Sequence, residues 1–213
     1  MNPFINIEEQ IDANLKLRGY TELTSIQKAI IEKEITGRDA IVSAQTGSGK
    51  TIAFGLSIVS NIPNNNYNKV KKLLSVLIIA PTRELALQVQ NELDWLYSKT
   101  SICIVSCVGG MDMRTEKRNL KKFPDIILGT PGRLKDYLER EVINLSNVKV
   151  VVLDEADEML NLGFRKELEY ILSQTPKERR TLLFSATFSK QIEKLASKFQ
   201  SNAFRISTIE KIN

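Results

Sequence analysis

The sequence predicts an α/β fold built on a mostly parallel sheet. Seven short apolar segments recur along the 213 residues, and several are apolar continuously rather than alternately, as strands covered by helices on both faces are. Repeated strand, helix and strand units imply right-handed crossovers, with a binding crevice beyond the carboxyl ends of the strands. The expected strands lie within residues 39–44, 73–80, 101–108, 125–130, 148–157, 180–187 and 203–207.

Helices are expected between these strands. Residues 83–98 and 189–200 place apolar side chains at three- and four-residue spacing, which is typical of amphipathic helices. The Asn-rich stretch at 61–72 predicts an exposed loop. A chain of this length predicts one domain, in which residues 39–213 form the core and residues 1–38 precede it.

Composition excludes several classes of protein. Hydrophobic residues at 42% and charged residues at 26% are typical of a soluble globular chain, and no apolar run reaches the length of a membrane span. Residues 1–15 lack the apolar core of a secretory signal, so a cytoplasmic location is expected. The net charge of +5 suits an anionic partner such as nucleic acid, although so modest an excess is more often only a solvated surface.

The cysteine and histidine content removes two kinds of site. Cys103 and Cys107 share one face of a predicted strand about 13 Å apart, which is too far for a disulfide, so we expect reduced thiols in the core. The chain has no histidine, which excludes a Cys/His zinc site and a Ser-His-Asp triad.

The stretch SAQTGSGKTIAF, at 43–54, predicts a phosphate-binding loop. It follows a predicted strand, begins a predicted helix, and fits the pattern G-x-x-x-x-G-K-[ST] except at Ala44. Backbone N–H groups at a helix start can surround an anion; Lys50 can reach the outer phosphates, and Thr51 can offer its hydroxyl to Mg²⁺. The alternative is a glycine turn that only starts a helix. The candidate ligand-binding residues are Ala44, Gln45, Thr46, Gly47, Ser48, Gly49, Lys50 and Thr51.

Two carboxylates follow the apolar run in VVVLDEADEML. Asp154 and Glu155 are expected at the carboxyl end of the sheet, where the phosphates should lie. Asp154 suits Mg²⁺, which prefers oxygen ligands, and Glu155 could orient or deprotonate an attacking water. Acidic residues after a strand also serve as helix caps, and this alternative weakens once the segment is paired with the phosphate loop.

Residues 154–157 spell DEAD, and with the other motifs the chain resembles the DEAD-box ATP-dependent RNA helicases. AQTGSGKT at 44–51 is similar to that family's form of the phosphate loop, and GYTELTSIQ at 19–27 resembles its Q motif, with Phe4 upstream and Leu23 where proline is frequent. The other motifs that carry the resemblance are PTRELALQV from 81, the glycine pair at 109–110, TPGRL from 130 and SAT from 185.

The resemblance implies a RecA-like domain that binds ATP and Mg²⁺. In such a domain Gln27 would read the adenine edge and Tyr20 would stack on the ring, whereas taken singly they are an ordinary surface glutamine and a packing aromatic. Asp157, Ser185 and Thr187 would form a network near the γ-phosphate that couples hydrolysis to RNA binding. Trp95 is expected in the core.

RNA is the second ligand that the resemblance implies. The loops after three predicted strands should open onto one edge of the sheet and contact the RNA backbone without reading its sequence. Arg83 and Arg133 can each present a fork to a phosphate. Helix capping by the threonines is the alternative, and it can coexist with RNA binding. The candidate RNA-binding residues are Pro81, Thr82, Arg83, Gly109, Gly110, Thr130, Pro131, Gly132 and Arg133.

The resemblance also implies a partner that these 213 residues do not include. Family members carry a second RecA-like domain that supplies an arginine finger, and its motif of the type HRIGR occurs nowhere in the sequence. We therefore expect an incomplete enzyme that is nearly inactive alone. Two rival functions remain at this stage: a DNA helicase or other phosphate-loop ATPase, and a binding module gated by nucleotide without catalysis.

Overall fold

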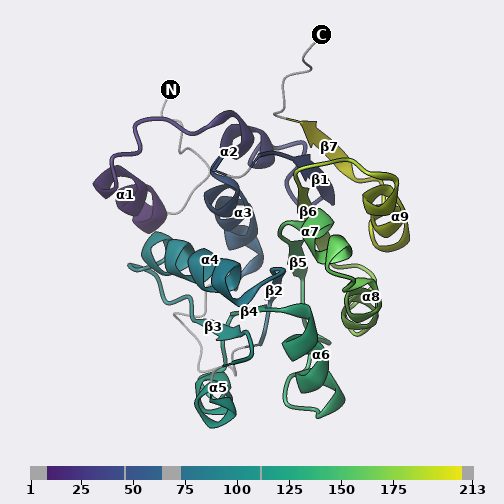
Figure 1. Cartoon of the computed structure of the whole chain (residues 1–213). Coiled ribbons are helices and arrows are strands. Elements are labelled where there is room, and N and C mark those ends of the chain that lie inside the picture. The colour runs from purple at the N-terminus through teal and green to yellow at the C-terminus, as the bar shows by residue number, and fades with distance from the viewer. Residues whose placement is uncertain (1–8, 46, 64–72, 111, 208–213) are drawn as a thin grey trace.

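A single sheet of seven parallel strands forms the centre of the molecule, which confirms the α/β prediction (Figure 1). The computed structural model describes residues 9–45, 47–63, 73–110 and 112–207. The strand order is β3-β4-β2-β5-β6-β1-β7, and all six pairings are parallel. Each strand lies inside the segment expected for it: β1 Ala40–Ser43, β2 Val76–Ile79, β3 Ile104–Cys107, β4 Ile126–Gly129, β5 Val150–Leu153, β6 Arg180–Ser185 and β7 Phe204–Ser207.

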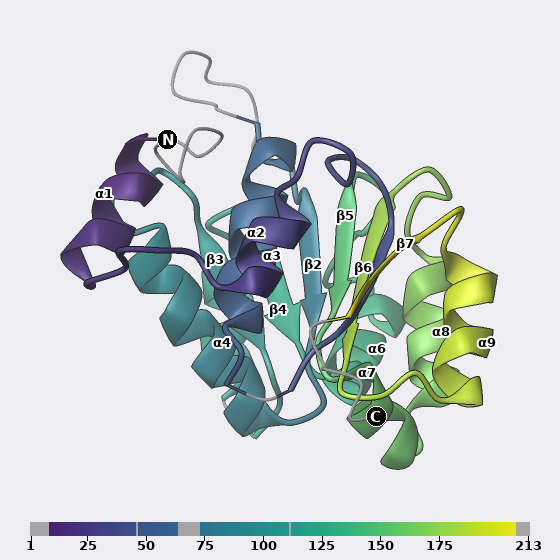
Figure 2. The same cartoon turned by 90° about the horizontal axis from the view of Figure 1, so that it is seen from above.

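Helices cover both faces of the sheet (Figures 1 and 2). One face carries α1 Glu9–Leu17, α2 Ser25–Ile30, α3 Lys50–Ile58 and α4 Arg83–Leu96, with a short 3₁₀ helix at Val59–Asn61. The other face carries α6 Pro131–Glu139, α7 Ala156–Asn161, α8 Arg165–Ser173 and α9 Lys190–Phe199, and α5 Met113–Leu120 packs beside the edge strand β3. The helices expected at 83–98 and 189–200 are confirmed, whereas residues 64–72 of the expected loop lie outside the described residues.

The continuous apolar character of the strands follows from burial on both faces. In β5, Val150 and Val152 pack into the core beneath α1–α4, while Val151 and Leu153 pack into the core beneath α6–α9. Because successive strand residues point to opposite faces, a strand with helices on both sides needs an apolar residue at every position. All four residues of β5 are 1% exposed or less.

The two cysteines lie at β3, in the apolar part of the structure. Cys103 directly precedes β3 and Cys107 ends it; neither forms a disulfide with a described residue, and both contact the same apolar cluster. Burial, with a smaller effect from the charge of Glu116, raises the pKa of the Cys107 thiol to about 12. Within the described ranges, no helix combines the length and the apolar character needed to cross a lipid bilayer.

The parallel sheet brings six of the candidate motifs to one edge. Since the strands run in the same direction, the loops that follow their carboxyl ends meet there. Six of these loops carry the residues selected from the sequence: Gln45 after β1, Thr82 after β2, Gly109 after β3, Thr130 after β4, Asp154 after β5 and Thr187 after β6.

Candidate functional site

The loop between β1 and α3 has the backbone geometry of a tight anion-binding turn. Gly47 and Gly49 have φ angles of 81° and 82°, in the left-handed region that favours glycine. A Cβ atom at Gly49 would lie 2.5 Å from Nε2 of Gln27, so a side chain there would require Gln27 to move. Helix α3 begins at Lys50 and directs its positive N-terminal end toward the loop. Thr46 lies outside the described residues.

The segment before β1 supports this loop from behind. Gln27 Nε2 donates to the carbonyl of Gly49 at 3.3 Å, and Thr24 Oγ1 donates to the carbonyl of Ser48 at 3.3 Å. The Oε1 atom of Gln27 accepts from the backbone N–H of Thr24 at 2.9 Å. Gln27 is fully buried and does not line the cleft described next. The structure thus shows Gln27 holding the loop, and its reading of adenine stays a prediction.

A cavity of about 390 Å³ opens in front of the loop. Its lining combines the residues selected from two distant parts of the sequence: Gly47, Gly49, Lys50, Thr51, Asp154 and Glu155. Side chains from α4 and from the segment after α1 complete the walls, among them Tyr20, Glu92 and Trp95. Phosphate-binding and metal-binding candidates therefore share one cleft.

Lys50 and Glu155 face each other across this cleft. The Nζ atom of Lys50 lies 3.7 Å from Oε1 of Glu155, and the two side chains are 8% and 20% exposed. Glu155 has a φ of 51°, a left-handed conformation that costs about 1 to 2 kcal/mol for a residue with a Cβ. Such strain concentrates at functional sites. Here it turns the Glu155 carboxylate toward Lys50 at the start of α7.

Asp154 is the carboxylate best suited to bind a metal ion. Its side chain is buried, and none of the described residues hydrogen-bonds its Oδ1 atom. Burial raises the pKa of Asp154 to about 6; Lys50 opposes this shift and Glu155 adds to it. A buried carboxylate oxygen beside the hydroxyl-bearing Thr51 matches the oxygen ligands that Mg²⁺ prefers, so the residues present fit that ion.

Asp157 connects the start of α7 with the segment after β6. Its Oδ2 atom accepts from the backbone N–H of Ala186 at 3.1 Å and from Oγ1 of Thr187 at 3.3 Å. Ser185 is fully buried, and its hydroxyl donates to the carbonyl of Thr187 at 2.8 Å. The three residues selected for a network are thus joined, directly or through one backbone group.

Trp95 corrects one expectation. It was expected in the core; it packs against the core beneath α1–α4, but it is only partly buried and also lines the cleft. Its ring centroid lies 6.0 Å from that of Tyr20, and the guanidinium of Arg18 lies 4.9 Å from the Trp95 centroid. The amphipathic pattern of α4 placed Trp95 on the apolar face correctly, but it could not show that this face extends beyond the core into a cleft.

The loops after β2, β3 and β4 form the candidate RNA face. Thr82 caps α4 by accepting from the N–H of Leu85 at 3.2 Å, which confirms the capping alternative for this residue. Thr130 makes no side-chain cap; its hydroxyl donates to the carbonyl of Val108 at 3.3 Å. Pro131 occupies the first turn of α6, as expected, and Gly132 is exposed beside it.

The glycine pair lies between the two arginines of this face. Gly109 and Gly110 have φ angles of 72° and 66°. A Cβ on Gly110 would lie 2.7 Å from Nη1 of Arg83, and one on Gly109 would lie 3.5 Å from Nη2 of Arg133. Both guanidinium groups therefore lie beside a turn that only glycine adopts readily, and Arg83 lies too close to Gly110 for a side chain there.

Arg133 is already paired inside the protein. Its Nη1 atom donates to Oε2 of Glu116 at 2.8 Å and to the hydroxyl oxygen of Tyr137 at 3.0 Å. Glu116 is 1% exposed, and its Oε1 atom accepts from the N–H of Val108 at 3.1 Å. Burial and the hydrogen bond to Glu116 raise the pKa of Tyr137 to about 12, so its hydroxyl stays protonated and donates to Glu116. Glu116 was not selected from the sequence, where it is one charged residue in a polar helix.

Residues 24–195 match the profile of the DEAD/DEAH box helicases. The chain belongs to this family. The ATP-dependent RNA helicase CshA of Limosilactobacillus reuteri is 42% identical over 198 residues, which are 93% of this chain and 39% of that protein. CshA of Listeria monocytogenes is 44% identical over 193 residues, which are 91% of this chain and 36% of that protein. This DEAD/DEAH box chain thus spans less than half the length of these relatives.

A solved structure supports the same assignment. The DEAD box protein of the hyperthermophile Methanococcus jannaschii superimposes with a TM-score of 0.88 and 37% sequence identity. The match covers 96% of this chain and 55% of that one. The described residues of the DEAD/DEAH box chain therefore share the fold of that protein.

Proposed function

We propose that this chain contributes the ATP-binding and part of the RNA-binding machinery of an ATP-dependent RNA helicase. The observation that carries the proposal is the convergence of Lys50, Asp154 and Glu155 in one cleft at the carboxyl edge of the sheet. The names of the CshA relatives support ATP as the nucleotide and RNA as the partner. A cytoplasmic location remains the expectation.

The residues of the cleft have separable roles in this proposal. The N–H groups of the loop and the ammonium of Lys50 bind the phosphates, and Lys50 leaves Glu155 as it does so. Asp154 and Thr51 hold Mg²⁺, which supplies neutralisation of the phosphate charge. Glu155, once released, orients and deprotonates the attacking water.

RNA binding is proposed for the loops after β2, β3 and β4. Arg83 is exposed, and its guanidinium can pair with a phosphate without reading a base. The network from Asp157 to Thr187 lies at the same edge and can couple the two ligands. A second RecA-like domain of the same protein is the proposed partner, since an arginine finger raises the rate of phosphoryl transfer by about 10³ to 10⁵.

Two measurements on the 213 residues test this proposal. Calorimetric titration is expected to show ADP binding that is stronger than GDP binding, while phosphate release with or without single-stranded RNA should stay near background. Absence of any nucleotide binding would contradict the assigned site. Robust RNA-dependent turnover would instead contradict the need for a second domain. In a longer chain that includes that domain, Glu155→Gln should abolish turnover and keep nucleotide binding.

A further inference from the structure

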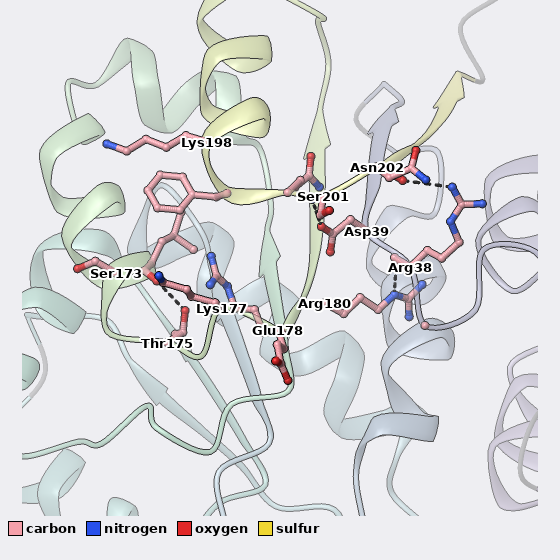
Figure 3. Close-up of a pocket in the computed structure, with 15 residues that line it drawn as sticks. Arg38, Asp39, Ser173, Thr175, Lys177, Glu178, Arg180, Lys198, Ser201 and Asn202 are labelled. Atoms are coloured by element: carbon pink, nitrogen blue, oxygen red, sulfur yellow. Dashed lines mark hydrogen bonds between the residues drawn. The ribbon is translucent and has the colours of Figure 1, made fainter.

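A second and larger cavity lies at the opposite end of the sheet from the nucleotide cleft. It has a volume of about 750 Å³, against about 390 Å³ for the cleft. Three segments line it: residues 37–39 before β1, the connection from α8 to β6, and the end of α9 with the residues after it (Figure 3). All three lie at the amino ends of β1, β6 and β7, so no residue of the cleft contributes.

The lining of this cavity is basic. It contains two carboxylates, Asp39 and Glu178, and the following five cationic side chains: Arg38, Lys177, Arg179, Arg180 and Lys198. Leu172 and Phe199 supply an apolar part of the wall. A cavity of this size and composition suits a small anionic molecule with an apolar body.

Two of the charged residues already use their polar atoms in hydrogen bonds to the backbone. Asp39 accepts from the backbone N–H groups of Thr181 and Ser201, each at 2.6 Å. Arg180 donates from all three of its nitrogens to backbone carbonyls between 2.6 and 3.2 Å. Burial lowers the pKa of Arg180 to about 10, and Asp39 opposes this shift. These two side chains hold β1 to β6 and are not available to a ligand.

Arg179 is different, because one whole edge of its guanidinium has no partner among the described residues. Its Nη1 atom donates to the carbonyl of Pro176 at 2.8 Å, but no described residue accepts from Nε or Nη2. The residue is 9% exposed, and burial lowers the pKa of its guanidinium while Asp39 opposes the shift. Buried donors without an acceptor are rare in proteins and require an explanation.

We propose that the cavity at the amino ends of β1, β6 and β7 is a second ligand site, in which Arg179 binds the carboxylate or phosphate group of a small molecule. In a guanidinium group the Nε–H and Nη2–H bonds point the same way and match two oxygens of a carboxylate or phosphate. Arg179 lines the cavity, and its Nε and Nη2 atoms are buried, so the proposal requires the guanidinium to turn, with loss of the Pro176 hydrogen bond, before its free edge meets a ligand. Lys177, on the same connection, adds positive charge at the rim.

The signal of the Arg179 Nε–H group in an ¹⁵N–¹H spectrum provides the test. The probes are sodium phosphate and sodium benzoate, each compared with sodium chloride at equal ionic strength. We expect the Arg179 signal to shift saturably with at least one probe. A shift with phosphate alone identifies a phosphate site, and a shift with benzoate alone identifies a carboxylate site. A shift with both probes identifies a site that accepts either group. No saturable shift with either probe would overturn the proposal.

Three variants separate this site from the nucleotide cleft. Lys50→Ala removes phosphate binding in the cleft and should leave the Arg179 shift unchanged; loss of the shift would overturn the proposal. Arg179→Lys keeps the charge but removes the fork, and should weaken probe binding about tenfold in thermal-shift titrations. The matched control Arg38→Lys should bind as the wild type does, because the Arg38 guanidinium is engaged with the carbonyl of Asn202 and the ring of Phe204. The wild-type spectrum decides the matter even where a variant fails to fold.

Discussion

The Nη1 atom of Arg133 lies 2.8 Å from Oε2 of Glu116, and the two side chains are 14% and 1% exposed. The net charge of the pair is therefore close to zero. Arg133 lies beside the turn at Gly109, and Glu116 accepts a hydrogen bond from the N–H of Val108. Arg83 is exposed, and no described carboxylate forms an ion pair with it. Two arginines that the sequence presented as equivalent phosphate ligands thus differ in their available charge.

The salt dependence of RNA binding should distinguish these two arginines. Each phosphate neutralised by a free cation adds about 0.7 to the slope of log K against log salt for a single strand. Arg83→Gln should lower this slope by about that amount, because a released counterion is lost. Arg133→Gln should weaken binding with little change in slope. Fluorescence anisotropy with a short unstructured RNA measures both, and equal slope changes would show that Arg133 contacts phosphate directly.

The strands were fully predictable from the sequence, and the helices only in part. Strands such as β5 are buried on both faces, so every residue is apolar and the run is unmistakable. The helices α1, α2 and α7 have nine, six and six residues. Such lengths are too short for a period of 3.6 residues to stand out from chance.

The composition of the nucleotide cleft was predicted, but not the contacts that shape it. Lys50 follows β1 and Asp154 follows β5, and only β6 separates these two parallel strands in the sheet, so the topology brings both residues to the same edge. The burial of Gln27 against Gly49 and the pairing of Glu116 with Arg133 depend on side-chain packing between distant segments. Neither Gln27 nor Glu116 stands at a sequence spacing that could have revealed its partner.

Trp95 should report nucleotide binding through its fluorescence. It is the only tryptophan in the chain, and it lines the same cleft as Lys50 and Thr51. Binding of ADP with Mg²⁺ should change the polarity around the partly exposed ring and therefore shift or quench its emission. The control is Lys50→Ala, in which the change should require a much higher ADP concentration because a charge-assisted contact is lost. An emission spectrum that stays constant while calorimetry shows binding would place the nucleotide away from Trp95.

Gly49 and Gly47 provide a matched pair of substitutions in the phosphate loop. Both have left-handed φ angles, so alanine costs about 1 kcal/mol of backbone strain at either position. A Cβ at Gly47 meets no described atom within 4 Å, whereas one at Gly49 lies 2.5 Å from Gln27 Nε2. Urea unfolding should therefore show a larger loss of stability for Gly49→Ala than for Gly47→Ala. Equal losses would mean that Gln27 moves aside without cost, and that its contact with the loop is not tight.

The raised pKa of Asp154 predicts that the unliganded chain becomes more stable when this residue is neutral. The pKa is 3.8 for an ordinary aspartate and about 6 in the folded chain, because burial disfavours the charged form. Below pH 3.8 the carboxyl is protonated in both states and contributes nothing to the pH dependence. As the pH rises, the unfolded chain ionises first, so the folded state loses relative stability until the pH passes about 6.

Above that pH the penalty is constant at about 2 to 3 kcal/mol, and Asp154→Asn removes it. Urea unfolding in EDTA should therefore show the variant to be more stable than the wild type at pH 7.5, with a difference that shrinks as the pH falls toward 4. The control is Asp136→Asn, which breaks a surface pair with Arg140 and should lower stability by less than about 1 kcal/mol. A stability difference for Asp154→Asn that does not change between pH 7.5 and 4.5 would show that burial does not disfavour the ionised Asp154 carboxylate. The argument that a cation is needed beside Oδ1 would then fail.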